Sequence, residues 1–206
     1  MRMHTTSDVR PFHRAAVLAS IDVVAAVTRD DLHRPTPCEG WNLLDLLAHM
    51  TVQHHGFAAA ARGGGDSPAV WASDRVADAV AADPGGTYAA AAADVLDAFA
   101  PDRVLDATIA LPEFAPGAAF PGAMAIGFHF VDYVVHGWDF ARSIGAPFAL
   151  SDDVVAAVLP LVFVVPDGEY RTMDGAPFGP AIAAPHGATD LDRIVSHLGR
   201  SPDWKP

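Results

Sequence analysis

Hydrophobic residues recur at helical spacing along most of the chain. The pattern covers residues 9–32 and then residues 42–62. Asn42 and Asp45 stand three residues apart at the start of the second segment, which is the spacing of a helix capping box. A glycine triplet at 63–65 follows its end. We therefore expect two helices in the first part of the chain.

The same periodicity returns in four later segments, at residues 87–99, 123–144, 151–165 and 190–198. A short segment at 71–82 leads through the turn-forming sequence Asp-Pro-Gly-Gly into the first of them. Gly145 and Pro147 stop the second, and Ser151 precedes two aspartates at the start of the third. These signals predict four further helices.

Two stretches rich in proline and glycine separate these helices. Residues 101–121 predict a crossover loop, in which residues 106–111 suit an extended conformation and a hairpin. Residues 166–187 predict an ordered, irregular loop over the helices. A long crossover suits a four-helix bundle that is not simply up-down-up-down.

These elements predict an all-α fold in a single domain, since 206 residues suit one sizeable hydrophobic core. We expect a four-helix bundle core at residues 1–165, and the irregular loop with a short C-terminal helix at residues 166–206. Apolar helix faces in excess of those that one core needs would suit a homodimer.

Charge and cysteine content narrow the partners and the compartment. Thirteen Lys and Arg against 25 Asp and Glu give a formal net charge of −12, which repels nucleic acid and anionic membranes. The longest apolar run, residues 154–165, is too short to span a bilayer, and no secretory cleavage site follows the apolar run at 15–19. Cys38 is the only cysteine, so no internal disulfide is expected. A reducing cytoplasm fits this composition.

A narrow polar stripe runs along the apolar segment 123–144. On a regular helix it falls within an arc of roughly 80°, and its members are His129, Asp132, His136 and Asp139. A solvated face would normally recruit Lys, Glu or Arg, whereas this stripe holds only side chains that can coordinate a metal. The alternative is an ordinary wet face with incidental histidines.

Asp132 and His136 are four residues apart, so they can share one cation from a single helix face. A facing helix must supply a third ligand, and the segment 42–62 offers His49, His54 and His55. Each of the three could instead be a core or surface histidine with a satisfied hydrogen bond. Periodicity leaves the choice open, because His54 lies nearer the centre of the apolar stripe and His49 at its margin.

Three sequence blocks together carry a family resemblance. They are Thr-Pro-Cys-Glu-Gly-Trp at 36–41 with Asp-Leu-Leu-Ala-His at 45–49, Asp-Tyr-Val-Val-His-Gly-Trp-Asp-Phe-Ala-Arg at 132–142, and Leu-Gly-Arg-Ser-Pro-Asp-Trp at 198–204. The combination resembles the mycothiol-dependent maleylpyruvate isomerase-like branch of the DinB superfamily. It spans most of the chain.

The resemblance implies a DinB-like four-helix bundle that binds one divalent metal, usually zinc, with nickel or iron also suited to the ligands. By position, the ligands are His49, Asp132 and His136. The isomerases of that family are usually described with Glu at the acidic position, where this sequence has Asp132. The resemblance also implies a low-molecular-weight thiol, such as mycothiol, as cosubstrate.

Four other residues are candidates to line the pocket, namely His129, Tyr133, Asp139 and Arg142. The sequence assigns no catalytic residue. Trp41 and Trp138 are expected as core anchors rather than substrate contacts. Cys38 has two interpretations. It is an incidental turn residue, which is the commoner case, or a reactive thiol beside the site.

Three protein ligands leave a coordination position open, which is typical of a catalytic rather than a structural zinc. Our leading hypothesis is a zinc-dependent thiol transferase or isomerase that acts on a small molecule. One alternative is a non-catalytic metal-binding scaffold or small-molecule sensor. Another is a metal-dependent hydrolase with Asp139 or another carboxylate as general base.

Overall fold

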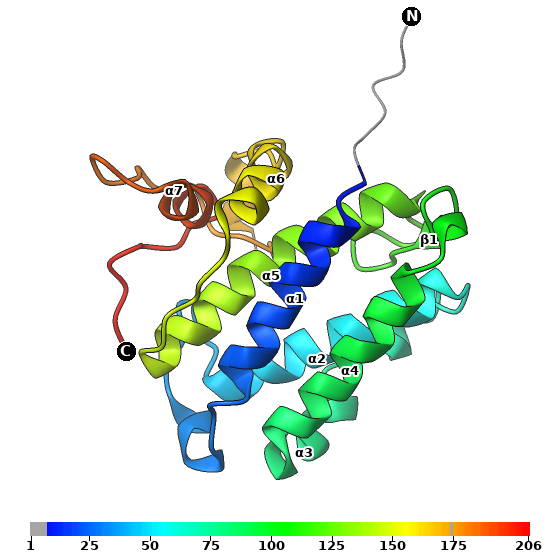
Figure 1. Cartoon of the computed structure of the whole chain (residues 1–206), viewed down its shortest axis with the longest axis horizontal. Helices are drawn as coiled ribbons and strands as arrows, with labels where there is room; N and C mark the ends of the chain where they lie inside the picture. The colour runs from blue at the N-terminus through cyan, green and yellow to red at the C-terminus, as the bar shows by residue number, and fades with distance from the viewer. Residues whose placement is uncertain (1–7, 174) are drawn as a thin grey trace, which may run out of the picture.

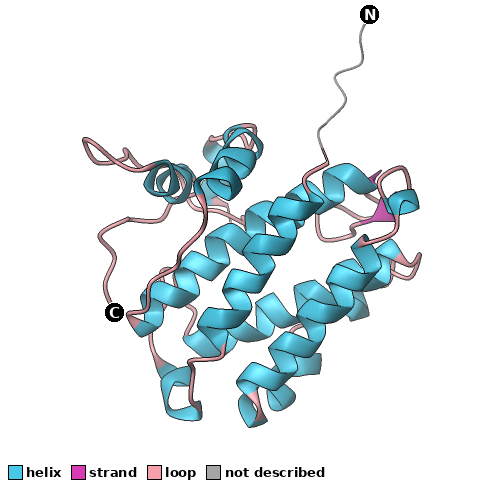
Figure 2. Cartoon of the chain, viewed as in Figure 1, coloured by secondary structure: helices cyan, strands magenta, loops and turns pink. Residues whose placement is uncertain are grey.

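The computed structural model describes residues 8–173 and 175–206, and helices make up nearly all of its regular secondary structure, as Figure 2 shows. Residues 1–7, which the predicted domain includes, lie outside the described residues. Four long helices form the bundle, namely α1 (Arg10–Val24), α2 (Leu43–Ala61), α4 (Pro84–Phe99) and α5 (Gly122–Ile144). Helix α2 packs against α4 and α1 packs against α5 (Figure 1). The predicted all-α fold is confirmed.

The boundaries of α2 and α5 follow the predicted signals. The Asn42 side chain accepts a hydrogen bond from the Asp45 N–H at 3.0 Å, and the Asp45 carboxylate accepts one from the Asn42 N–H at 3.0 Å. This capping box satisfies two N–H groups that the first turn of a helix would otherwise leave unpaired. Helix α5 ends at Ile144, and Gly145 caps it with φ 69°, a left-handed conformation that glycine adopts without the steric cost of a side chain.

The first predicted helix is too long. Helix α1 ends at Val24, and a separate 3-10 helix, η1 (Arg29–His33), follows it. The Asp31 carboxylate accepts hydrogen bonds from both the N–H and the hydroxyl of Thr28, at 3.0 and 2.7 Å. This local capping starts a new element where hydrophobic spacing alone predicted a continuous helix to residue 32.

The connector and turn predicted before the third bundle helix are also helical. All but two of residues 71–82 lie in η2 (Pro68–Trp71) and α3 (Asp74–Ala82), and α4 then begins at Pro84. The Asp83 side chain accepts a hydrogen bond from the Gly86 N–H at 3.0 Å. Proline at the first helical position loses no hydrogen bond, so the Asp-Pro-Gly-Gly sequence caps the helix instead of preceding it.

The crossover carries the predicted hairpin. After η3 (Asp102–Val104), strand β1 (Thr108–Ala110) pairs antiparallel with β2 (Ala119–Pro121), with Ile109 opposite Phe120. The Gly122 N–H then donates to the Ala107 carbonyl at 2.8 Å, which joins the hairpin to the first turn of α5.

A C-terminal layer covers the outer side of α5 and α1. It consists of α6 (Asp152–Phe163), η4 (Glu169–Thr172) and α7 (Asp190–His197), joined by the predicted irregular loop. The buried Arg171 holds this loop, since its guanidinium donates to the carbonyls of Pro166 and Gly179 at 2.9 and 3.1 Å. Among the described residues, none of the helices combines the length and apolar character needed to cross a membrane.

Three histidines from different helices form a chain inside the bundle. His13 Nε2 lies 2.8 Å from His129 Nδ1, and His129 Nε2 lies 3.3 Å from His54 Nδ1. The Tyr133 ring stacks on both His54 and His129, with centroids 4.0 and 4.1 Å apart. Burial lowers the pKa of His13 from 6.5 to about 3, and it also lowers the pKa of His54 and His129. The three rings are therefore neutral in the fold.

These buried neutral histidines make stability depend on pH. Between about pH 6.5 and 3 the unfolded chain binds protons that the folded His13 does not, so its contribution is present above pH 6.5 and is lost as the pH falls. Each such histidine costs about 1.4 kcal/mol per pH unit in that window. Urea unfolding at several pH values should show a steep decline in the free energy of unfolding below pH 6.5.

His13→Gln should make this decline shallower, because glutamine does not titrate, even if it lowers stability at neutral pH. His33→Gln, at an exposed position of η1, is the matched control and should leave the slope unchanged. Equal slopes for wild type and His13→Gln would contradict the prediction.

Candidate metal centre

The structure brings His49 of α2 together with Asp132 and His136 of α5. One ligand atom from each side chain lies within 4.8 Å of those of the other two. His136 Nε2 is 3.3 Å from Asp132 Oδ1, and the rings of His49 and His136 have centroids 5.1 Å apart. The α-helical spacing of Asp132 and His136 places both on the side of α5 that faces α2.

Periodicity did not choose between His49 and His54, but their positions in the structure differ. His54 is fully buried and contacts His129 in the histidine chain, whereas His49 lies on the partly exposed side of α2 next to Asp132 and His136. The histidine at the centre of the apolar stripe thus lies in the core, and the histidine at its margin lies in the candidate site.

These donors fit a zinc-class ion. Zinc binds imidazole and carboxylate donors at about 2.0–2.2 Å, so tetrahedral donors lie about 3.4 Å apart. The 3.3 Å separation of His136 Nε2 and Asp132 Oδ1 is of that size. The Asp132 side chain is 22% exposed, which leaves the site open to small molecules. Two imidazoles and one carboxylate suit zinc, nickel or iron.

Behind His136 lies a second carboxylate. His136 Nδ1 is 3.0 Å from Asp139 Oδ2, and the Asp139 side chain has no solvent exposure. A proton on Nδ1 that is donated to Asp139 leaves the lone pair of Nε2 directed toward His49 and Asp132. Metal-binding histidines are commonly oriented in this way.

The charges at the site also favour a cation. Burial opposes ionisation, yet the negative charge of Asp132 and the hydrogen bonds to Asp132 and Asp139 raise the pKa of His136 well above its ordinary value. Burial, followed by the charge of His136, lowers the pKa of His49 to about 4. The surrounding carboxylates thus favour a positive charge at His136, and the same electrostatic field would favour a cation held at Nε2 beside Asp132.

Arg200 closes the buried side of the site and was not among the predicted site residues. Its Nη2 is 3.2 Å from Asp139 Oδ2 and 3.5 Å from Cys38 Sγ. Cys38 Sγ in turn lies 3.2 Å from Asp139 Oδ2. Cys38, His136 and Asp139 also have metal-ligand spacing, but the Arg200 guanidinium already supplies a positive charge there. The His49 side of His136 is therefore the better candidate position for a metal ion.

One sequence signal pointed to Arg200 without revealing its role. It lies in the block at 198–204 that carries part of the family resemblance. Cys38 lies in the block at 36–41, which also carries part of the resemblance, and it is half-buried with its Sγ against the Asp139 carboxylate.

Of the four candidate pocket residues, only Asp139 contacts His136, from behind. His129 belongs to the buried histidine chain, and the Tyr133 hydroxyl donates to the Met50 carbonyl. Arg142 is exposed, with its guanidinium 5.1 Å from the centre of the Trp138 ring. Asp139 is fully buried and engaged by His136 and Arg200, so it is not free to act as the general base of a hydrolase.

Trp41 is not the core anchor that the sequence predicted. It is 37% exposed, and its ring lies 5.0 Å from that of His49 and stacks at 6.4 Å on that of His136. The indole therefore covers one side of the candidate site. Trp138, in contrast, is buried as expected.

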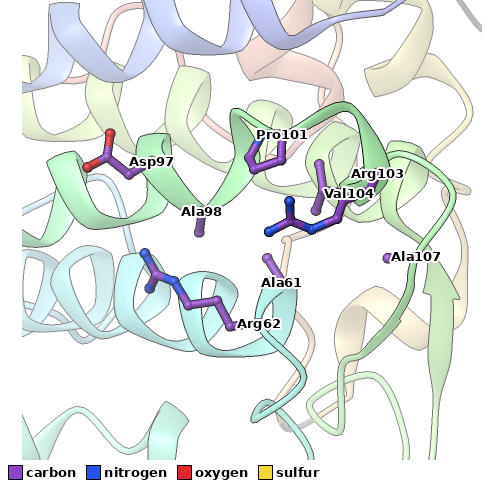
Figure 3. A pocket seen from close by; sticks show the side chains of 8 residues that line it. All are labelled: Ala61, Arg62, Asp97, Ala98, Pro101, Arg103, Val104 and Ala107. Atoms are coloured by element: carbon purple, nitrogen blue, oxygen red, sulfur yellow. The ribbon is translucent and has the colours of Figure 1, made fainter.

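A hollow in the surface lies at a different place. Figure 3 shows it between the C-terminal ends of α2 and α4, where Arg62 and Arg103 line it. Arg62 is paired with Asp94 at 2.8 Å. None of the predicted metal ligands lines this hollow, so the candidate site is the His49 cluster, whose side chains could hold a metal ion.

The chain is similar in sequence to a described protein family. The profile of the family described as the mycothiol maleylpyruvate isomerase N-terminal domain matches residues 13–141. Uncharacterized proteins from two strains of Mycobacterium tuberculosis are each 28% identical over 192 residues, which cover 92% of this chain and 96% of theirs.

Two solved structures share the fold. They are the crystal structure of the mycothiol-dependent maleylpyruvate isomerase and that of a histidine-to-alanine mutant of it, at 15% and 13% identity and TM-scores of 0.58 and 0.56. Each superposition covers 76% of this chain and 67% of the other. The predicted DinB-like helical fold is confirmed.

The site predicts about one divalent ion per chain in untagged wild-type protein. His49→Ala and His136→Ala should each lose it, because two remaining donors hold a metal weakly. Element analysis after reconstitution with zinc measures the stoichiometry, and far-UV circular dichroism checks that the variants fold.

His55→Ala is the matched control, because it removes a half-buried histidine of the same helix from outside the cluster. It should retain the metal. Metal content at the wild-type level in both His49→Ala and His136→Ala would contradict the assigned ligands.

Proposed function

The chain belongs to the mycothiol maleylpyruvate isomerase N-terminal domain family, as its sequence blocks predicted, and we propose that it is a metal-dependent, thiol-using enzyme. In this proposal a low-molecular-weight thiol such as mycothiol attacks a small electrophilic substrate. The reaction is a thiol transfer or a thiol-assisted isomerisation.

The observation that carries the proposal is the convergence of His49, Asp132 and His136 within 4.8 Å, with the Asp139 carboxylate behind His136. Three protein ligands leave room for an exogenous molecule. When bound, a zinc-class ion lowers the pKa of a thiol, so that the nucleophilic thiolate forms near neutral pH.

The chain's own thiol is poorly placed to be the nucleophile. Cys38 Sγ lies toward Nδ1 of His136, at 3.8 Å, and not toward the Nε2 side where His49 and Asp132 converge. It also contacts Asp139 and Arg200. This arrangement supports a nucleophile that is supplied by a cosubstrate.

The open side of the site suits a small cosubstrate. His49 and Asp132 are partly exposed there, and the Trp41 ring lies beside them. An indole at this position can exclude water from one face of a bound molecule and contribute stacking contacts. Asp139 stays buried and orients His136, which leaves Asp132 as the carboxylate of the open side.

Thiol dependence is the test. We expect zinc-reconstituted protein to consume maleylpyruvate or chlorodinitrobenzene only when mycothiol, bacillithiol or glutathione is added. An isomerase returns the thiol unchanged, whereas a transferase leaves the sulfur in the product, so mass spectrometry of the products separates the two. His49→Ala should lose the activity and His55→Ala should keep it.

The visible spectrum of cobalt-substituted protein gives a second readout that needs no substrate. Added thiol should change this spectrum, because sulfur near the metal alters its ligand field. A metal that binds tightly, with no thiol altering its spectrum and no thiol-dependent turnover, would instead support a non-catalytic metal-binding scaffold or sensor.

The acidic ligand offers a further prediction. Asp132→Glu should retain zinc, because it keeps a carboxylate at the position where the isomerases usually have Glu. Loss of a residue that only supports a ligand weakens metal binding by about 10–100-fold. Asp132→Asn removes a ligand itself, so it should weaken zinc binding by more than about 100-fold. Competition with a chromophoric chelator measures both affinities. Equal affinities for Asp132→Asn and wild type would exclude Asp132 as a ligand.

A further inference from the structure

Arg200 approaches the candidate metal centre from a part of the chain that the family match at residues 13–141 does not include. It follows α7 and is only 7% exposed. A buried guanidinium needs partners for its charge and its N–H groups. Those partners connect the C-terminal region to His136.

We propose that Arg200 is a positioning residue for the metal centre, which acts through Asp139 on the ligand His136. This inference rests on the proposed metal-dependent function. In this proposal the C-terminal region contributes to metal binding and does not only pack against the bundle.

The first step is the contact between Arg200 and Asp139. Arg200 Nε lies 3.4 and 3.3 Å from the two carboxylate oxygens, and Nη2 lies 3.2 Å from Oδ2. The planar guanidinium thus engages the carboxylate through two nitrogens, which restricts its rotation more than a single point charge would. Oδ2, the oxygen closest to Arg200, is also the one that accepts from His136 Nδ1.

The second step is the charge balance. Asp139 is fully buried, and an unpaired carboxylate there would be strongly destabilising. His136 must be neutral to bind a metal, so it cannot then balance Asp139 with a charge of its own. The permanently charged guanidinium of Arg200 is the cation that stays beside Asp139 in that state.

The third step is the support of Arg200 itself. Its Nη1 donates to the Leu198 carbonyl at 2.7 Å, and its guanidinium lies 5.5 Å from the centre of the Phe178 ring. Gly199 adopts φ 82°, and a Cβ there would lie 2.8 Å from the backbone of Gly179. Only glycine fits this turn, which directs the next residue back toward α5.

A purely structural role is the alternative, in which Arg200 merely fastens the C-terminal segment. Arg171 provides the comparison. It is also a buried arginine of the C-terminal region, but its hydrogen bonds go to carbonyls, including that of Gly179, and to Tyr170 rather than to Asp139. Loss of Arg171 should loosen the same region without disturbing the partner of His136.

The experiment compares Arg200→Gln, Arg200→Lys and Arg171→Gln in the full-length chain. Zinc affinity is measured by chelator competition, the metal environment by the visible spectrum of the cobalt form, and the stability of the metal-free protein by urea unfolding. We expect Arg200→Gln to bind zinc about 10–100-fold more weakly, with an altered cobalt spectrum. Arg200→Lys should recover part of the affinity, because an ammonium keeps the charge without the planar fork.

Arg171→Gln should lose stability and keep both the zinc affinity and the cobalt spectrum. Wild-type affinity and spectrum in Arg200→Gln would overturn the inference, as would equal losses of affinity in Arg200→Gln and Arg171→Gln. If Arg200→Gln does not fold, Arg200→Lys decides by the same two readouts, with a weaker affinity and an altered spectrum as the supporting result.

A double-mutant cycle tests the route through Asp139. If Arg200 acts on His136 through Asp139, Arg200→Gln combined with Asp139→Asn should weaken zinc binding no more than Asp139→Asn does. Additive losses would overturn that route. Failure of the wild type to bind any metal would instead remove the proposed function, so the two failures can be told apart.

Discussion

The buried carboxylate of Asp139 is the group on which the rest of the site depends. It has no solvent exposure, so its charge must be matched inside the protein. His136, Arg200 and Cys38 all lie within hydrogen-bonding distance of it, and they come from the middle, the end and the beginning of the chain. The need to satisfy one carboxylate therefore brings three distant segments together beside the candidate metal ligands.

The interface of α2 and α5 contains histidines in two different environments. His54 and His129 are buried in a chain where desolvation keeps the rings neutral, and Tyr133 stacks on both. His136 is equally buried but lies between two carboxylates, which favour a positive charge. Burial alone therefore does not decide what a histidine does. The neighbouring carboxylates separate the candidate site from the core.

Family membership and the local geometry support each other at different levels. The family match covers the bundle and the two helices that carry His49, Asp132 and His136. The geometry adds the support behind these ligands, including an arginine from beyond the matched region. It also places Trp41 at the open side, where an indole can contact a bound molecule. The chemistry proposed for the site thus depends on residues from nearly the whole length of the chain.

Local signals in the sequence determined the helical class, the capping of α2 at Asn42, the end of α5 at Gly145 and the hairpin in the crossover. Each of these features depends on residues close together in the chain, so their spacing is informative. The pairing of Asp132 with His136 is of the same kind. Where local signals competed, as at Thr28 and Asp83, hydrophobic spacing placed the helix boundary wrongly because side-chain capping decided it.

The tertiary structure decided what lies opposite these residues. Periodicity could not choose between His49 and His54, since that depends on how α2 is rotated against α5. It placed His129 and Asp139 on one stripe with the ligands, although one belongs to the histidine chain and the other supports His136 from behind. Arg200 could be connected to Asp139 only by the fold, because a contact across 61 residues leaves no periodic trace in the sequence.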